Sequence, residues 1–162
     1  MHREAREFVT HFKTTRPVLV IEIGSLNVNG SIRDLFPKAS WIGIDRAAGP
    51  CVDVVGDAEK FDPSALVDVV ICCEVLEHAD NWAALIQKAY SWLAPGGVFI
   101  MTCAGLGRTP HSCDGGKLKS GEYYRNLSPP EVRAQIEHVG FQWQLTKQVQ
   151  TDIQSFAVKG NT

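Results

Sequence analysis

The sequence lacks the marks of a membrane-spanning, exported or strongly nucleic-acid-binding protein. Its 162 residues contain no apolar run approaching the roughly 18 residues that span a membrane. The formal net charge is −2, from 16 basic and 18 acidic residues, so the strongly basic balance of a nucleic-acid-binding domain is absent. The opening residues, MHREARE, lack the apolar core of a signal peptide, and we therefore expect a cytoplasmic protein.

Cysteine is scarce and poorly placed for disulfides or metal binding. The five cysteines are odd in number, and none belongs to a Cys-x-x-Cys pair or a Cys/His cluster. Cys72, Cys73 and Cys103 lie in apolar runs, where a thiol packs as a small hydrophobic side chain. Cys113 lies in a polar segment and is the one plausible reactive thiol. We expect a reduced protein without a metal site.

Two glycine-rich phosphate-binding motifs are also missing. No Gly-Lys-Ser/Thr ends a loop, which excludes a P-loop. A Gly-x-Gly-x-x-Gly motif is absent as well, because Leu26 stands where its second glycine would be. The absence of this motif disfavours a nucleotide-binding oxidoreductase. One glycine, Gly24, does follow the first apolar run directly.

The sequence does contain a regular alternation of amphipathic segments and β-branched apolar runs. Apolar spacing predicts helices over 3–14, 32–36, 82–93 and 128–139. Apolar runs predict strands over 18–23, 41–44, 51–55, 67–73, 98–102, 141–149 and 152–159. The alternation indicates an α/β protein with a doubly wound parallel sheet. The last two strands are joined by a very short turn and must therefore be antiparallel.

We expect a single domain over 1–162 with four parts. Residues 1–16 hold the N-terminal helix, and 17–103 hold the alternating strands and helices. Residues 104–127 show no periodicity, and 128–162 hold the closing helix and strand pair. Because irregular segments of this length inside a domain are usually functional or disordered, we expect 104–127 to bind a substrate.

Polar residues stand at the predicted carboxyl ends of the strands, where ligands bind in open α/β sheets. Asp45, after the second strand, can accept hydrogen bonds from two ribose hydroxyls or can simply be a solvated strand-end residue. Asp57, after the third strand, can accept a bond from an adenine amino group or can cap the turn that follows. Glu74 and His78 follow the fourth strand at the rim of the predicted cleft.

Five motifs occur in a fixed order: Glu22-Ile23-Gly24-Ser25, Gly43-Ile44-Asp45-Arg46, Gly56-Asp57-Ala58, Glu74-Val75-Leu76-Glu77-His78 and Leu93-Ala94-Pro95-Gly96-Gly97. This series resembles the class I S-adenosylmethionine-dependent methyltransferases over about residues 17–103, and the closing antiparallel pair extends the resemblance to the C-terminus. The resemblance implies a Rossmann-like seven-stranded sheet of order 3-2-1-4-5-7-6, with strand 7 antiparallel and helices on both faces. It also implies an enzyme whose cofactor is S-adenosyl-L-methionine.

For the methionine end of the cofactor, the resemblance implies five binding residues. Gly24 and Ser25 would approach the methionine portion, and Glu22 would support their loop. Cys73 and Glu74 would line the cofactor next to the transferred methyl group.

For the adenosine end, the resemblance implies four further residues. Asp45 would bind the ribose, and Arg46 would cover the adenine. Asp57 and Ala58 would lie along the edge of the adenine ring. The first loop departs from the family pattern Asp/Glu-x-Gly-x-Gly-x-Gly, because Leu26 replaces one glycine and Val28 stands at the last; we expect a different loop shape there.

Methyl transfer from a sulfonium is an in-line displacement on an activated donor, so alignment supplies most of the catalysis. A general base is needed only where the acceptor arrives protonated. His78 and His111 are the catalytic residues that we expect for this role, ahead of Glu74, Asp114 and Tyr123.

The acceptor is the least determined part of the prediction. Four basic residues gather in the irregular segment: Arg108, Lys117, Lys119 and Arg125. They suit an anionic small-molecule acceptor methylated on O or N, or they form a solvated loop of mixed charge. Nucleic-acid or nucleotide methylation is disfavoured by the acidic balance and by Glu131, which replaces the aromatic of a Ser-Pro-Pro-aromatic motif. A catalytically silent cofactor-binding partner subunit, and a homodimer, stay open.

Overall fold

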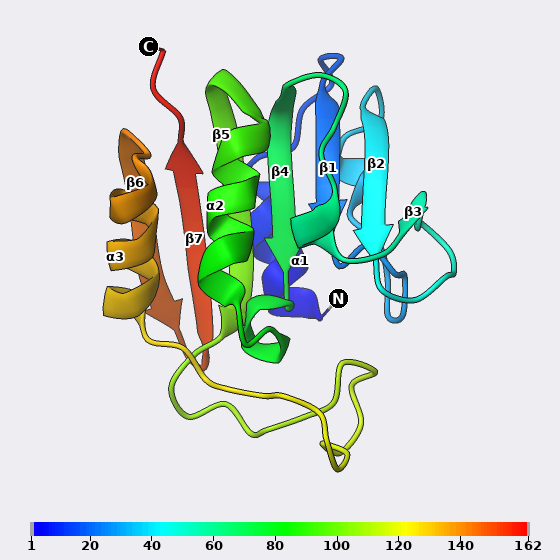
Figure 1. Ribbon diagram of the computed structural model, residues 1–162, viewed down its shortest axis with the longest axis vertical. Coiled ribbons are helices and arrows are strands. Elements are labelled where there is room, and N and C mark those ends of the chain that lie inside the picture. The colour runs from blue at the N-terminus through cyan, green and yellow to red at the C-terminus, as the bar shows by residue number, and fades with distance from the viewer. Residues whose placement is uncertain (1, 162) are drawn as a thin grey trace.

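The seven strands of the computed structural model, which describes residues 2–161, form one sheet of order β3-β2-β1-β4-β5-β7-β6 (Figure 1). The strands are β1 (Leu19–Ile23), β2 (Ser40–Asp45), β3 (Val54–Val55), β4 (Val67–Cys73), β5 (Leu93–Ala104), β6 (Trp143–Val149) and β7 (Asp152–Val158). The helices are α1 (Arg3–Thr10), α2 (Trp82–Trp92) and α3 (Pro129–Val139), with single 3-10 turns η1 (Arg33–Leu35), η2 (Ala58–Lys60) and η3 (Leu76–His78).

The pairing directions confirm the predicted sheet. The pairs β3–β2, β2–β1, β1–β4 and β4–β5 are parallel, whereas β7 runs antiparallel to both β5 and β6. The turn between β6 and β7 contains only Gln150 and Thr151, and Gln150 adopts a left-handed φ of 54°. So short a connection forces the antiparallel pairing.

Helices cover both faces of the sheet, as predicted. In Figure 1, α2 and α3 lie in front of the sheet and α1 lies behind it. Two separate clusters of buried side chains match these faces: Ile21 and Ile86 belong to the cluster under α2 and α3, and Val20 and Val9 to the cluster under α1. The strands between them are therefore largely apolar on both sides, which explains why β-branched residues follow one another in β1 and β4.

Several element boundaries differ from the sequence prediction. The predicted helix over 32–36 is only the 3-10 turn η1, and the predicted third strand over 51–55 shrinks to Val54–Val55. The fifth strand begins at Leu93 and not at Val98. Pro95-Gly96-Gly97 does not stop this strand, because the pairing register with β4 shifts there and the extra residues are absorbed as a bulge.

The start of α3 confirms that Ser128-Pro129-Pro130-Glu131 is a helix cap. The backbone N–H of Ser128 donates to Glu131 Oε2 at 3.1 Å, and the Ser128 hydroxyl donates to the same oxygen at 2.6 Å. Pro129 occupies the first helical position, where no N–H is needed. Gly140 ends the helix with a left-handed φ of 105°.

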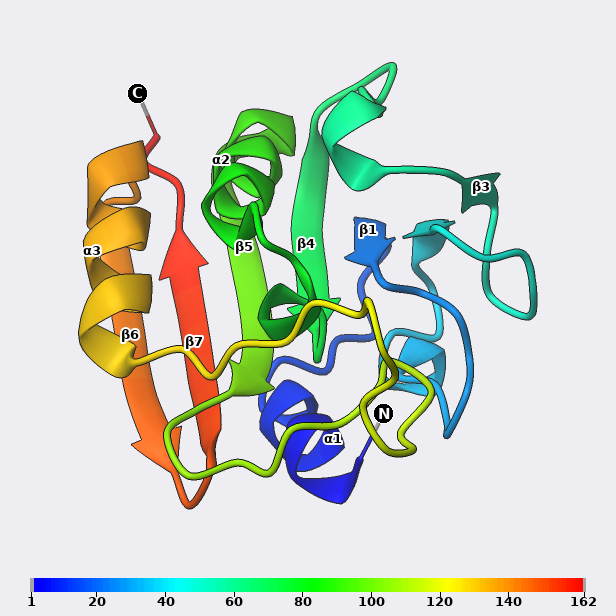
Figure 2. The same ribbon diagram turned by 60° about the horizontal axis from the view of Figure 1, so that its bottom comes forward.

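The segment 105–127 contains no helix or strand. Figure 2 shows it crossing the carboxyl ends of β5 and β4 before it returns to α3. Two backbone bonds fix its return: Arg125 N–H donates to Glu77 O at 2.8 Å, and Leu127 N–H donates to Ala104 O at 3.0 Å. None of the helices over residues 2–161 has the length and apolarity needed to cross a membrane.

Candidate active site

The loop after β1 is shaped by one glycine. Gly24 has a φ of +74°, in the left-handed region that disfavours side chains, and its N–H donates to Ile44 O of β2 at 2.9 Å. A Cβ at Gly24 would lie 2.2 Å from Val75 Cγ2, in the loop after β4. The glycine therefore permits both the turn and the close approach of the β1 and β4 loops.

Glu22 and Ser25 flank this glycine and are both buried. Glu22 is 6% exposed, and its nearest cationic partner is Arg33 Nε at 3.5 Å. Burial raises the pKa of Glu22 to about 7, although the charge of Arg33 acts in the opposite direction. The Ser25 hydroxyl is buried against Gly43 of β2 and has no hydrogen-bond partner among residues 2–161.

Asp45 ties the departing loop to the end of β2. Its Oδ2 accepts from Leu26 N–H at 3.1 Å and its Oδ1 accepts from Ala47 N–H at 2.9 Å. Leu26, which stands at a usual glycine position, is thus held by its backbone, while Val28 is 47% exposed. The carboxylate expected at a ribose is therefore also the anchor of the first loop.

The predicted adenine side is more open. Arg46 is exposed, and its guanidinium lies 3.8 Å from the Asp57 carboxylate. Asp57 caps η2 by accepting from Glu59 N–H at 3.3 Å, so the capping alternative raised from the sequence is real. Ala58 is buried beneath this turn. The structure brings these residues beside Asp45, because β2 and β3 pair through Asp45 and Val55.

Glu74 lies after β4 and has an unusual backbone for its type, with φ 59°. Its Oε1 accepts from the Thr102 hydroxyl at 2.8 Å and its Oε2 lies 2.6 Å from His2 Nε2. Burial acts to raise the pKa of Glu74, but His2, Thr102 and Arg108 outweigh it, and the net shift is downward. Burial raises the pKa of the neighbouring Cys73 thiol to about 12, so this thiol is not a nucleophile, and its side chain packs against the cluster under α1.

An ion-pair network surrounds Glu74 and joins four distant parts of the chain. Arg108 pairs with the Asp152 carboxylate, and its guanidinium lies 3.6 Å from Glu74 Oε2. His2, at the start of α1, lies 3.7 Å from Asp152. The hydrogen bond to Glu74 raises the pKa of His2. Sequence reasoning missed His2 and Asp152, because neither belongs to a motif and each finds its partners only in the folded chain.

His78 and His111, predicted separately, meet in the structure. Their ring centroids are 5.2 Å apart, and both rings pack edge-on against Tyr124, at 5.4 and 5.0 Å. Burial, followed by the charge of His111, lowers the pKa of His78, so His78 is neutral near pH 7 and able to accept a proton.

Glu77 lies beside these histidines and was not singled out from the sequence. Its side chain is fully buried, and its Oε1 accepts from Ala104 N–H at 3.0 Å. The second oxygen, Oε2, has no partner among the described residues. Burial and the nearby charge of Glu74 raise the pKa of Glu77 to about 8. The only sequence signal was its place in the Glu74–His78 motif.

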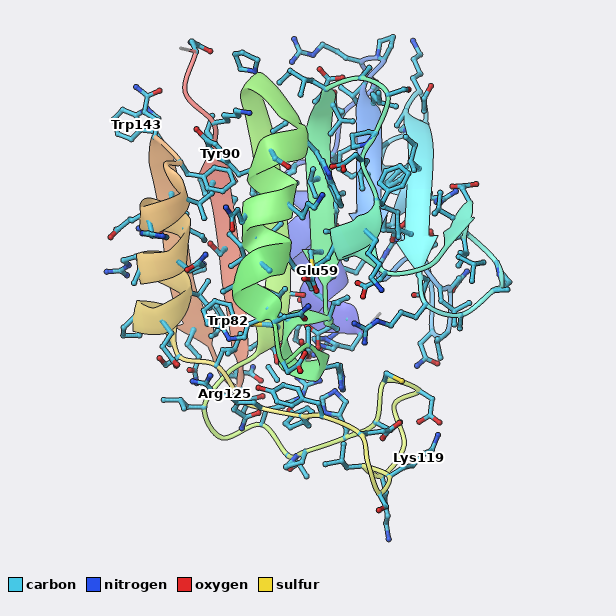
Figure 3. The ribbon with its side chains drawn as sticks, in the orientation of Figure 1. Glu59, Trp82, Tyr90, Lys119, Arg125 and Trp143 are labelled. Atoms are coloured by element: carbon cyan, nitrogen blue, oxygen red, sulfur yellow. The ribbon has the colours of Figure 1, made fainter. Side chains whose placement is uncertain are left out.

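Most of the positive charge in the 104–127 segment is neutralised within the protein. Arg108 pairs with Asp152, Lys119 with Asp114, and Arg125 with Glu131. Lys119 lies on the part of the segment that is farthest from α3, whereas Arg125 lies near the start of α3 (Figure 3). Within 2–161, Lys117 alone of the four predicted cations forms no ion pair, which weakens the argument from charge for an anionic acceptor.

Solved structures of methyltransferases share this fold. The chain aligns over 98% of its length, and over 77% of the other chain, with 1,6-didemethyltoxoflavin-N1-methyltransferase from Burkholderia thailandensis, at 15% identity and a TM-score of 0.70. The chain also aligns over 96% of its length, and over 85% of the other chain, with the N-methyltransferase NodS from Bradyrhizobium japonicum, at 15% identity and a TM-score of 0.68. Human N-acetylserotonin methyltransferase is similar at 20% identity and a TM-score of 0.61, over 88% of this chain but 47% of its own.

These three proteins were crystallised with S-adenosylmethionine or S-adenosylhomocysteine. Curated protein sequences contain no significant match to this chain. The methyltransferase domain family matches residues 20–143, which include every strand from β2 to β5 and both motif-bearing loops after β1 and β4. With this match and the sheet order 3-2-1-4-5-7-6, the chain belongs to the class I S-adenosylmethionine-dependent methyltransferase family.

Proposed function

We propose that the protein is an enzyme that transfers a methyl group from S-adenosylmethionine to an oxygen or nitrogen atom of a small-molecule acceptor. The observation that carries this proposal is the joint placement of Gly24 and Asp45: a left-handed glycine after β1 and a carboxylate at the end of β2 that anchors the same loop. In open α/β sheets this is where a nucleoside ligand is held.

The residues present fit the methionine end of this cofactor. Gly24 lets the backbone approach, and Ser25 offers a buried hydroxyl that has no partner among residues 2–161. Glu22 and Cys73 support this end from β1 and β4, while Glu74 is held in place by His2 and Thr102.

At the adenosine end, Asp45 would accept hydrogen bonds from the ribose, and Arg46, Asp57 and Ala58 would surround the adenine. When bound, the cofactor supplies a methyl group on a sulfonium, which needs no further activation. The protein's task is then to align the acceptor with that methyl group.

The acceptor side is bounded by the 105–127 segment. His78 and His111 lie together there and would take a proton from an acceptor that arrives protonated. A small-molecule acceptor is supported by the similar 1,6-didemethyltoxoflavin-N1-methyltransferase, which was crystallised with 1,6-didemethyltoxoflavin.

Calorimetric titration with S-adenosylmethionine and S-adenosylhomocysteine tests the proposal. We expect saturable binding by the wild-type protein and at least fivefold weaker binding (about 1 kcal/mol) by Asp45→Ala, because charge-assisted hydrogen bonds are lost. Asp62→Ala, which removes an exposed acid paired with Lys88, is the matched control and should bind like wild type. Absence of binding at millimolar cofactor would refute the proposal, and tight binding of NAD instead would favour an oxidoreductase.

A further inference from the structure

Two groups of side chains in residues 2–161 each bring three potential metal-ligating atoms within 4.8 Å of one another. The first consists of His2, Glu4 and Asp152, and the second of Glu77, His78 and His111. The first group is already satisfied, because His2 pairs with Glu74 and Asp152 pairs with Arg108. The second group has no such partners and carries the inference.

Glu77 is the central observation in this second group. Its side chain is 0% exposed, and only one of its two oxygens is hydrogen-bonded, to Ala104 N–H. The other oxygen is buried with no donor and no cationic side chain within ion-pair distance among the described residues. Burying a carboxylate oxygen without a partner lowers the free energy of unfolding, because the oxygen loses its hydration. A cation bound at this position would offset that loss.

The two histidines are arranged to present lone pairs. His111 Nδ1 lies 3.1 Å from the carbonyl oxygen of Thr109, which can only accept, so Nδ1 carries the proton and Nε2 has the free lone pair. A ring N–H bound to a backbone carbonyl is the usual support of a metal-ligating histidine. His78 follows Glu77 directly on η3, and its ring packs against that of His111.

We propose that Glu77, His78 and His111 bind a divalent transition-metal ion. One carboxylate oxygen and two imidazole nitrogens are the ligand set of catalytic zinc sites and of other divalent metal sites that keep positions open. Ligands of a tetrahedral zinc ion lie roughly 3.4 Å apart, so the cluster needs only a small inward movement of its side chains. Such a site departs from the sequence prediction, which expected no metal because it looked for Cys/His spacing.

If the proposed methyltransferase function holds, the open positions of this ion give the acceptor its chemical class. They suit a hydroxyl oxygen, whose pKa a bound divalent cation lowers. The hydroxyl proton passes to water, the oxygen lone pair forms the C–O bond to the methyl carbon, and the S–CH3 bond breaks with its electrons left on sulfur. The two histidines then hold the ion and not the proton.

Metal titration tests the site without reference to activity. Protein dialysed against EDTA is titrated with Zn2+ by calorimetry and with Co2+ by visible absorption. We expect one ion per chain, and at least tenfold weaker binding by Glu77→Gln and by His111→Gln. His138→Gln, which changes an exposed histidine on α3, is the matched control and should bind like wild type.

The variants also separate the alternatives. Absence of stoichiometric binding, or equal affinity in His111→Gln and His138→Gln, would overturn the proposal. Loss of binding in His2→Gln but not in His111→Gln would place the ion at the other cluster and overturn it as well. Should Glu77→Gln fail to fold, His111→Gln still decides the question, because His111 lies on the irregular segment.

A parallel titration with S-adenosylhomocysteine keeps the two proposals distinct. Binding of Zn2+ without binding of the nucleoside would support the metal site and refute the proposed methyltransferase function. Binding of the nucleoside without Zn2+ would refute the metal site alone.

Discussion

Glu22 on β1 is a buried carboxylate and Glu74, directly after the neighbouring strand β4, is a largely buried one, yet their surroundings shift their pKa in opposite directions. Among residues 2–161, Arg33 alone pairs with Glu22, at 3.5 Å, and burial raises the pKa of Glu22 to about 7. Glu74 has His2 at 2.6 Å as well as the Thr102 hydroxyl, and its pKa is lowered. The number and distance of the partners, and not burial alone, decide which form of a carboxylate the fold stabilises.

The predicted cofactor-binding loops and the ion-pair network around Glu74 also differ in how far apart in the sequence their contacting residues lie. The cofactor side is built from residues close together in the chain, such as Asp45 and Leu26, which are 19 positions apart. The ion-pair network around Glu74 is built from residues far apart, such as His2 and Glu74, which are 72 positions apart. Short-range contacts follow from motifs, whereas long-range ones depend on the whole fold.

The largest effect we expect is the pH dependence contributed by Glu22. Its pKa is raised in the folded protein, so its contribution to stability is fully present below about pH 4.5 and is lost as the pH rises through 7. The Glu22 contribution to the free energy of unfolding should fall over this interval by up to roughly 3 kcal/mol. Glu22→Gln should remove this part of the slope, whereas the part that comes from Glu77, whose pKa is raised to about 8, should stay. Denaturant unfolding at a series of pH values measures this dependence. If the free energy of unfolding of Glu22→Gln changed with pH as steeply as that of the wild type, the prediction would be wrong.

The next effect concerns the ion-pair network around Glu74. Arg108→Ala leaves the buried Asp152 carboxylate without its main cation, and we expect a loss of about 2 to 3 kcal/mol in the free energy of unfolding. Lys119→Ala breaks a fully exposed pair with Asp114, which solvent screens, and should change the free energy of unfolding far less. Similar losses in both variants, measured by denaturant unfolding, would show that burial does not distinguish the two pairs.

Gly24→Ala tests the glycine on the cofactor side. A side chain at φ +74° and 2.2 Å from Val75 Cγ2 should cost about 2 kcal/mol of stability. The double variant Gly24→Ala/Val75→Ala should recover part of this loss, because the clash is relieved but the backbone strain is not. Gly56→Ala meets no atom within 4 Å at an ordinary φ and should be nearly neutral. Thermal unfolding compares the three.

The smallest effect is that of His2. Its pKa is raised by Glu74, and that of Glu74 is lowered, so the pair stabilises the fold most between about pH 4.5 and 6.5 and loses strength on either side. We expect His2→Gln to lower the free energy of unfolding by about 1 kcal/mol in that window and by less at pH 9. A constant difference from pH 5 to pH 9 would show that the charge of His2 has no part in the effect.

Local patterns predicted much of the fold. The strand Val67–Cys73 has the predicted bounds, because the apolar run Val69–Cys73 that follows Asp68 is buried on both faces up to Glu74. The start of β5 was wrong, because Pro-Gly-Gly ends most strands and only the pairing with β4 and β7 lets this one continue. The segment around Arg33 was predicted as a helix but forms a single 3-10 turn.

The sequence by itself determined the α/β class and the closing antiparallel pair, because these depend on apolar periodicity and on the length of one turn. The motif series, through its resemblance to the methyltransferases, added the family and the strand order, and it predicted Gly24 and Asp45 as cofactor-binding residues. The sequence also singled out His78 and His111 as separate residues. Only the tertiary structure showed that these histidines meet beside Glu77, and that His2, Arg108 and Asp152 enclose Glu74. The physical reason is that burial and charge pairing act between atoms close in space, and the sheet brings together residues that lie 33 or more positions apart: Arg108 and Glu74 are 34 apart, and His78 and His111 are 33 apart.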